Sequence, residues 1–372
     1  MTTSTAYLDQ AIRLAQETAR CLRSGSLAPS ELRLRKIDPT AIADELDAFV
    51  SQRLLPIRHR WKVAQETPYV LALVGLTNVG KSTILEALLQ ARIVPRGNRP
   101  MTSVPVWYRH APTWALEIAM GGARIQRREY NAPSELLPDL RALMTDRVHP
   151  GGAVTAWVRV TGPLALLANG LELVDTPGFG AAQDESEGAR HQARLDAFLK
   201  TRVHRIYFCV AAADALVVKP EEHAYYNRLR EACGHVIVNK WTGTPAEQSE
   251  YVSRHQALFC NAEFVFVNAR RAGRRILEGA TAADSDRGEQ PEPDGFERLV
   301  QLVDRCASPA GRIEACEHEL ADAWRDLVDH ADTHLDLRPI PWQPFEFRRL
   351  AALTPRQSPL GRTIQHSSGA LP

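Results

Sequence analysis

Residues 66–90 read ETPYVLALVGLTNVGKSTILEALLQ, and the rest of the chain is best interpreted outward from this stretch. The apolar run 70–74 predicts a short buried strand, and the leucine and isoleucine residues of 82–90 recur at the spacing of one helix face. Between them, Gly75 to Ser82 form the pattern G-x-x-x-x-G-K-S. The alternative is a glycine-rich turn before an ordinary helix, but strand, loop and helix in this order are the context that a phosphate-binding P-loop requires.

The residue types in this loop suit a chain of phosphates. Gly75 and Gly80 allow backbone N–H groups to turn inward, and the helix expected to begin at Lys81 adds the positive end of its dipole. Lys81 supplies a charge for the β- and γ-phosphates, and the hydroxyl of Ser82 can enter the coordination shell of Mg²⁺. The candidate nucleotide-binding residues here are Gly75, Asn78, Val79, Gly80, Lys81, Ser82 and Thr83.

Composition limits the function classes. The chain has 45 Lys and Arg against 44 Asp and Glu, a net charge of +1, so no global field favours nucleic acid and we expect no nucleic-acid partner. Its 6 cysteines lack metal-ligand spacing and disulfide density, which indicates reduced thiols in the cytoplasm. No apolar run approaches the roughly 18 residues of a membrane span, and the first residues are unlike a signal peptide. Peripheral attachment to a membrane is the alternative that this composition allows.

A polar loop at residues 94–103, VPRGNRPMTS, follows the P-loop helix. In P-loop GTPases such a loop is the first switch, whose threonine hydroxyl reaches Mg²⁺ while its N–H meets the γ-phosphate. Thr102 is the candidate for both contacts. The alternative is an ordinary mobile loop.

A second motif occupies residues 171–180, LELVDTPGFG. An apolar strand that ends in Asp175 would place this carboxylate at the carboxyl end of the sheet, where it can hold Mg²⁺ through water. Gly178 leaves a backbone N–H for the γ-phosphate, and the polar run 181–191 suggests a second switch. A plain turn at a strand end is the alternative for D-T-P-G.

The strand expected at residues 235–238 ends in Asn239-Lys240-Trp241-Thr242. A guanine-specific N-K-x-D site would use Asn239 for the base edge and Lys240 over the ring. Thr242 stands where the aspartate belongs, and a hydroxyl lacks its bidentate charged acceptor, so discrimination against adenine should weaken. The next strand, 263–267, leads into Asn268, where a backbone N–H would meet the base.

The pattern of strands and helices predicts an α/β fold of the GTPase-type P-loop class. We expect a mixed, mostly parallel sheet with flanking helices and an antiparallel extension, plus a small helical bundle from both chain ends. The further strands are expected at 104–110, 114–119, 124–129, 155–160 and 205–211, and helices at 134–145 and 221–232.

Four regions follow from this pattern. Residues 1–65 form an N-terminal helical segment whose second helix should start at Asp38, followed by a proline at the first turn. Residues 66–275 form the nucleotide domain. Residues 276–336 are a linker and C-terminal helices that pack with the N-terminal ones, and 337–372 are a Pro/Arg-rich tail, predicted to be disordered.

The combination of these motifs resembles the dynamin-like and related septation-type GTPases of bacteria. The P-R-G-x-x-x-x-T pattern of residues 95–102 is most like dynamins, whereas the N-V-G-K-S of 78–82 looks more like ribosome-assembly and tRNA-modification GTPases. The resemblance covers residues 66–275. It implies a Mg²⁺-dependent, GTP-hydrolysing switch that controls self-association, with a homodimer through the nucleotide face, or binding of a protein or membrane partner. The alternative is a nucleotide-binding adaptor with little hydrolysis and relaxed base specificity.

The catalytic device is the least conventional part of the sequence. Phe179 stands where small signalling GTPases carry a water-orienting side chain. In the potassium-activated GTPases that the P-loop resembles, the residue at Asn78 offers its side-chain oxygen to K⁺. Asn78 could instead brace the loop by bonding its own backbone, and Arg96 or Arg99 of a second copy is a third alternative. The catalytic candidates are therefore Lys81, Thr102 and Asn78.

Overall fold

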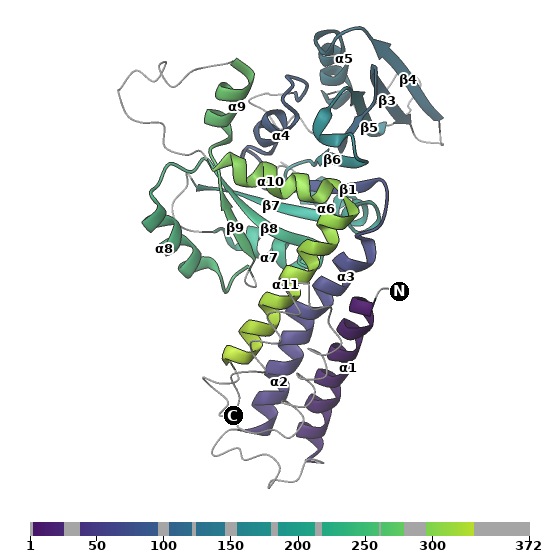
Figure 1. Ribbon diagram of the computed structural model, residues 1–372. Helices are drawn as coiled ribbons and strands as arrows, with labels where there is room; N and C mark the ends of the chain where they lie inside the picture. Colours follow the sequence, from purple (N-terminus) through teal and green to yellow (C-terminus); the bar gives the residue numbers. More distant parts are fainter. Residues whose placement is uncertain are drawn as a thin grey trace. The chain divides into compact units, whose positions relative to one another are not determined.

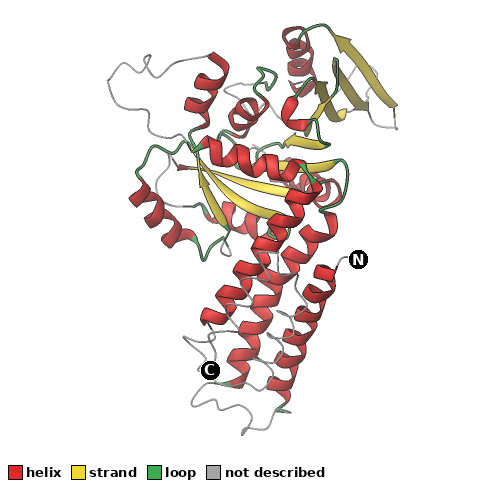
Figure 2. Cartoon of the chain, in the orientation of Figure 1, coloured by secondary structure: helices red, strands yellow, loops and turns green. Residues whose placement is uncertain are grey.

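The computed structural model describes residues 3–25, 38–95, 104–120, 124–145, 155–179, 185–212, 218–259, 262–278 and 295–330. They belong to two compact units (Figure 1). The sheet unit is Glu66–Pro309, and the helical unit combines Met1–Gln65 with Ala310–Pro372. Strands, drawn in yellow in Figure 2, occur in the sheet unit.

A nine-stranded sheet forms within the described part of the sheet unit. Strands β6, β1, β7, β8 and β9 run parallel, β2 is antiparallel to β6, and β3 is antiparallel to both of its neighbours. This confirms a mixed, mostly parallel sheet with an antiparallel extension. From edge to edge the order is β4 (Arg124–Tyr130), β3 (Trp114–Met120), β5 (Thr155–Gly162), β2 (Val106–His110), β6 (Leu171–Asp175), β1 (Tyr69–Gly75), β7 (Arg205–Ala211), β8 (Cys233–Asn239) and β9 (Glu263–Phe266).

Strand β1, which lies between β6 and β7, is buried along its whole length. A strand covered on both faces needs no alternation of polar and apolar residues, which explains its continuous apolar sequence. Its register with β6 pairs Leu73 with Asp175. Because the carboxyl ends of parallel strands share one edge, Asp175 lies beside the start of the P-loop.

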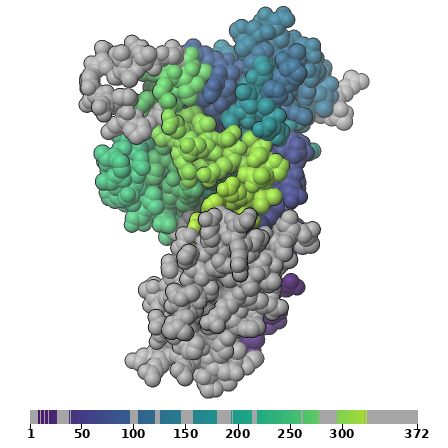
Figure 3. Space-filling view, viewed as in Figure 1, coloured from purple at the N-terminus to yellow at the C-terminus, as the bar shows by residue number. Residues whose placement is uncertain are grey.

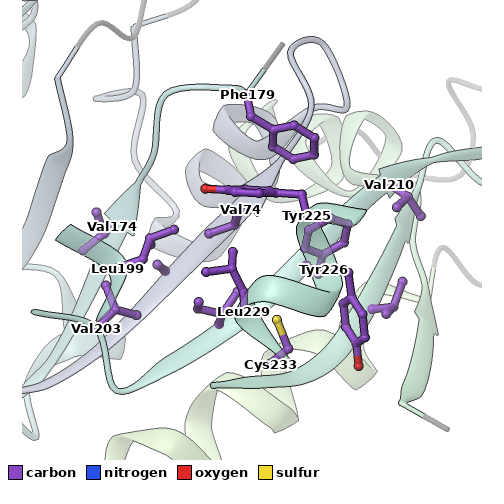
Figure 4. Close-up of a cluster of buried hydrophobic side chains, with 14 of the residues drawn as sticks. Val74, Val174, Phe179, Leu199, Val203, Val210, Tyr225, Tyr226, Leu229 and Cys233 are labelled. Carbon is purple, nitrogen blue, oxygen red and sulfur yellow. The ribbon is translucent and has the colours of Figure 1, made fainter. Parts of the chain in front are cut away.

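Helices cover both faces of the sheet. Val70, Ala72 and Val74 of β1 share a buried cluster with side chains of α6, α7 and α8 (Figure 4). The alternate residues of β1 point to the other face, on which α4 and α10 pack. The helices are α4 (Lys81–Leu89), α5 (Pro133–Thr145), α6 (Glu185–Arg202), α7 (Pro220–Leu229), α8 (Pro245–His255), α9 (Ala269–Glu278) and α10 (Phe296–Ala307), with a short 3₁₀ turn, η2 (Ala165–Leu167).

The position of α10 differs from the sequence prediction. It packs on β1 and β9 within the sheet unit instead of joining the N-terminal helices, and Figure 3 shows it in lime at the surface of this unit. Its apolar stripe, with Phe296 and Leu299 buried, completes the cover of the sheet. Gly295 begins the helix with φ +66, and a Cβ there would lie 1.9 Å from the carbonyl oxygen of Phe266. The end of β9 therefore fixes the start of α10.

Two boundaries also differ. Residues 185–191, part of the predicted second switch, are the first turns of α6. Leu195 and Leu199 of this helix are buried. Helix α9 extends to Glu278, beyond the expected end of the domain at residue 275. Residues 181–184 and 279–294 lie outside the described ranges, as does the predicted tail, 337–372.

The helical unit contains α1 (Thr3–Ser24), α2 (Pro39–Phe49), the π-helical turn η1 (Val50–Leu54), α3 (Leu55–Val63) and α11 (Pro309–His330). Asp38 caps α2 by accepting a hydrogen bond from the Thr40 N–H at 2.9 Å, which confirms the predicted start. Leu8, Leu54 and Leu320 share one buried cluster, so the two ends of the described chain contribute to one core. No helix in the described ranges has both the length and the apolar character needed to cross a bilayer.

Candidate nucleotide site

The P-loop connects the end of β1 to the start of α4. Asn78 and Gly80 have positive φ angles of 67° and 93°. A Cβ at Gly80 would lie 2.3 Å from Nδ2 of Asn239. Both the conformation and the space therefore require glycine at position 80, directly before the first residue of α4.

Lys81 is enclosed by this loop. Its Nζ donates hydrogen bonds to the carbonyl oxygens of Gly75, at 3.0 Å, and Leu76, at 2.9 Å. Burial lowers the pKa of Lys81, while the nearby carboxylate of Asp175 opposes this shift. These two carbonyl groups thus hold the ammonium group across the loop.

Two of the three predicted metal ligands lie together. The hydroxyl of Ser82 donates to Oδ2 of Asp175 at 2.9 Å. Oδ1 of Asp175 is buried and has no hydrogen-bond partner among the described residues. Burial raises the pKa of Asp175, and Lys81 and Ser82 oppose this. Hydroxyl and carboxylate oxygens are the hard ligands that Mg²⁺ prefers, so the donor set fits this ion. Thr102, the third ligand expected, lies outside the described residues, as do Arg96 and Arg99.

The segment after Asp175 runs against the P-loop. Leu76 and Phe179 form an isolated parallel bridge. A Cβ at Gly178 would lie 2.8 Å from the backbone N and Cα of Thr77, so only glycine permits this approach. The Phe179 ring is buried, with its centroid 4.2 Å from that of Tyr225, and Figure 4 shows it pointing toward that ring.

At the expected base-binding end, Asn239 is buried and uses both ends of its amide. Nδ2 donates to the Val79 carbonyl at 2.9 Å, and Oδ1 accepts from the Ala269 N–H at 3.1 Å. Lys240 and Thr242 are exposed after it, Lys240 with φ 62°. Asn268 donates to the carbonyl oxygen of Trp241 at 3.2 Å. The two loops predicted to hold the base are therefore linked to each other and to the P-loop.

Comparison with known proteins identifies the region that contains the P-loop and Asp175. The model of the Dynamin family matches residues 71–230. These residues form a dynamin-family domain. The result confirms the resemblance to dynamin-like GTPases inferred from the sequence.

Relatives of the dynamin-family domain occur among curated proteins. Clamp-binding protein CrfC of Escherichia coli strain K12 is 32% identical over 115 residues, which are 28% of this chain and 15% of that protein. Clamp-binding protein CrfC from Escherichia coli matches with the same values, 32% over 115 residues, 28% and 15%. The chain therefore covers a small part of the curated relatives it matches.

Two solved chains also align with this one. Both come from work on an oligomerised bacterial dynamin pair described as a mechanism for long-range sensing and tethering of membranes. The first has a TM-score of 0.48 and 14% identity, and the match covers 93% of this chain and 48% of that one. The second has a TM-score of 0.46 and 12% identity, with 95% and 60% covered.

One residue of the dynamin-family domain was absent from the sequence-based site. The hydroxyl oxygen of Thr77 is buried without a hydrogen-bond partner in the described structure, directly beside Gly178. Thr77 lies inside the G-x-x-x-x-G-K-S motif, but at one of the positions for which the motif specifies no residue type. Only the approach of the segment after Asp175 reveals that Thr77 lies against Gly178.

Proposed function

We propose that the dynamin-family domain binds GTP with Mg²⁺ and hydrolyses it. The observation that carries this proposal is the 2.9 Å hydrogen bond between Ser82 and Asp175 at the end of the loop that encloses Lys81. A hydroxyl, a buried carboxylate and an ammonium group converge there, as phosphoryl transfer requires.

Each residue has a role in this proposal. Lys81 and the backbone N–H groups of the P-loop hold the β- and γ-phosphates, and Gly178 presents a further N–H to the γ-phosphate. Ser82, Asp175 and Thr102 would hold Mg²⁺. When bound, this ion neutralises the charge on the phosphate oxygens. The protein contributes mainly by fixing these charges in advance, because electrostatic stabilisation of the transition state lowers the barrier of such reactions more than any other effect.

The nucleotide state would control self-association, through a homodimer at the nucleotide face, or binding of a partner. The switch would act in the cytoplasm, either free or attached peripherally to a membrane. Base selectivity should be relaxed, because Thr242 is neutral and exposed where an aspartate would bind guanine. The second candidate function is a nucleotide-binding adaptor with little turnover. It is favoured by Phe179, whose buried aromatic side chain cannot orient an attacking water molecule.

The test is phosphate release by the purified chain with GTP and Mg²⁺. We expect Lys81→Ala to abolish both nucleotide binding and phosphate release. Lys200→Ala, which removes an exposed lysine of α6 in the same unit, is the matched control and should behave like the parent. Undiminished turnover in Lys81→Ala would overturn the proposal, whereas tight binding without release by the parent chain would favour the adaptor.

A further inference from the structure

A second concave site lies in the sheet unit, apart from the nucleotide site. It is a pocket of about 400 Å³ formed by α4, the residues that follow it, α5 and α9. In Figure 1, α4 lies between α9 and α5. The P-loop, Asp175 and Asn239 contribute nothing to its lining. The volume is within the usual range for small-molecule sites.

Arginine side chains gather around this pocket. Its described lining includes Arg92, Arg141, Arg270 and Arg274, together with the carboxylate of Glu86. The four arginines come from three separate parts of the chain, so the cluster is a product of the fold and not of one basic run.

Two of these arginines have no partner in the described structure. Arg270 and Arg274 are both exposed and stand four residues apart on α9, a spacing at which like charges repel. Neither forms an ion pair with any described carboxylate, whereas Arg275 on the same helix approaches Glu297 at 3.9 Å. A bound anion would relieve this repulsion.

The other residues that line the pocket are apolar or lack a side chain. Val94, Leu137 and Leu277 add apolar surface. Gly273 has open space where a Cβ would stand, so the pocket reaches the backbone of α9. Guanidinium groups bind phosphate oxygens in a bidentate manner. A ligand with one carboxylate could pair with only one of Arg270 and Arg274, whereas two clustered phosphate groups could pair with both.

We propose that this pocket binds phosphate groups, two or more together, in addition to the nucleotide at the P-loop. The phosphates come either from a soluble phosphate ester or from the headgroups of an anionic lipid surface. The same guanidinium chemistry recognises both sources.

The test separates this site from the P-loop by working in the Lys81→Ala chain. Inorganic pyrophosphate is titrated calorimetrically, and sedimentation is measured with vesicles of phosphatidylcholine and phosphatidylglycerol. In this background we compare Arg270→Gln/Arg274→Gln with Arg271→Gln, an exposed arginine of the same helix that is outside the pocket. Arg141→Gln, from α5, is a second pocket variant.

The pocket variants should bind the probe at least about tenfold more weakly than Arg271→Gln, as expected when charge-assisted bidentate bonds are lost. A loss seen with pyrophosphate assigns the site to a soluble ester, and a loss seen only with vesicles assigns it to a lipid surface. Equal binding by pocket and control variants, or binding by neither, would overturn the proposal. Circular dichroism of each variant shows that the fold is retained.

Discussion

The side-chain Nδ2 of Asn239 donates a hydrogen bond to the carbonyl oxygen of Val79, 2.9 Å away, and so ties the carboxyl end of β8 to the P-loop. Oδ1 of the same amide accepts from the backbone of Ala269 at the start of α9. An amide nitrogen carries two hydrogens, so one group can serve Val79 and a base edge together. Asn239 therefore has a structural role that the N-K-x-D pattern alone does not reveal.

Asn239→Ala should destabilise the sheet unit and weaken nucleotide binding. The change leaves the Val79 carbonyl and the Ala269 N–H without their partner, and each unsatisfied buried group costs about 1–3 kcal/mol. Urea unfolding and nucleotide titration measure the two effects. Asn227→Ala is the control, because Asn227 is exposed and its side chain bonds to His223. If both variants unfold at the same urea concentration, Asn239 does not brace the loop.

Gly178→Ala should impair nucleotide binding and lower stability. The added Cβ would lie 2.8 Å from the backbone of Thr77, so the P-loop or the segment after Asp175 must shift. Gly273→Ala provides the opposite expectation, because a Cβ there meets no atom within 4 Å. In a helix interior, alanine stabilises the fold by roughly 0.5–1 kcal/mol relative to glycine. The Gly273→Ala variant should therefore melt at a slightly higher temperature. Thermal unfolding of both variants beside the parent measures whether each melting temperature falls or rises. An unchanged melting temperature in Gly178→Ala would refute the close approach to Thr77.

Local patterns predicted the candidate site residues that the structure brings together around the P-loop, because the chemistry of a phosphate site fixes residue type and spacing over a few positions. Lys81 and Ser82 come from one motif, and Asp175 follows from a strand that ends in a carboxylate. The pairing of Leu73 with Asp175 then places the motifs together, which the prediction required but could not show.

Features set by tertiary packing were harder to predict. The apolar stripe of α10 shows that this helix needs a partner, but the same stripe would suit either the sheet or the N-terminal helices. The contact of Gly295 with the end of β9 decides between them. The burial of Phe179 against Tyr225 likewise depends on α7, which begins at Pro220 and is separated from Phe179 by the whole of α6 and β7.

Thr242→Asp should increase the preference for GTP over ATP. Thr242 is exposed and follows Asn239 by the spacing of an N-K-x-D site, so a carboxylate there could accept two hydrogen bonds from guanine. Thr242→Asn is the control, since it has a similar shape without the charge. Competition between GTP and ATP for binding measures the ratio. A parent chain that already prefers GTP by about 10⁴-fold would show that another acid performs this role.

Glu263→Gln should reduce stability at neutral pH and lose this effect in acid. A hydrogen bond with His235, aided by Arg298, lowers the pKa of Glu263 from 4.5 to about 2. A carboxyl group with a depressed pKa stabilises the fold above its ordinary value, and the contribution fades as the pH falls from 4.5 toward 2. The side chain is 47% exposed, so we expect no more than about 1 kcal/mol. Unfolding of parent and variant across this pH range checks it; a difference that is constant with pH would contradict the ion pair.

The side chain of Asn78 is a candidate part of the catalytic device. Asn78 is exposed in the left-handed conformation, with φ 67°, and its side chain forms no hydrogen bond within the described structure. The described geometry therefore offers no support for the alternative in which Asn78 braces its own loop. An exposed amide oxygen at this point of the P-loop remains available to a monovalent cation beside the phosphates.

Hydrolysis should accordingly be faster in potassium than in sodium at equal ionic strength, and Asn78→Ala should remove the difference. Alanine is strained at a positive φ, so Asn78→Gly is the matched variant, because glycine adopts this backbone conformation without strain and lacks the side-chain amide. If Asn78→Gly also loses the potassium effect, the side-chain amide and not backbone strain is responsible. Equal rates in the two salts, together with a rate that rises steeply with protein concentration, would instead indicate that Arg96 or Arg99 of a second copy supplies the positive charge.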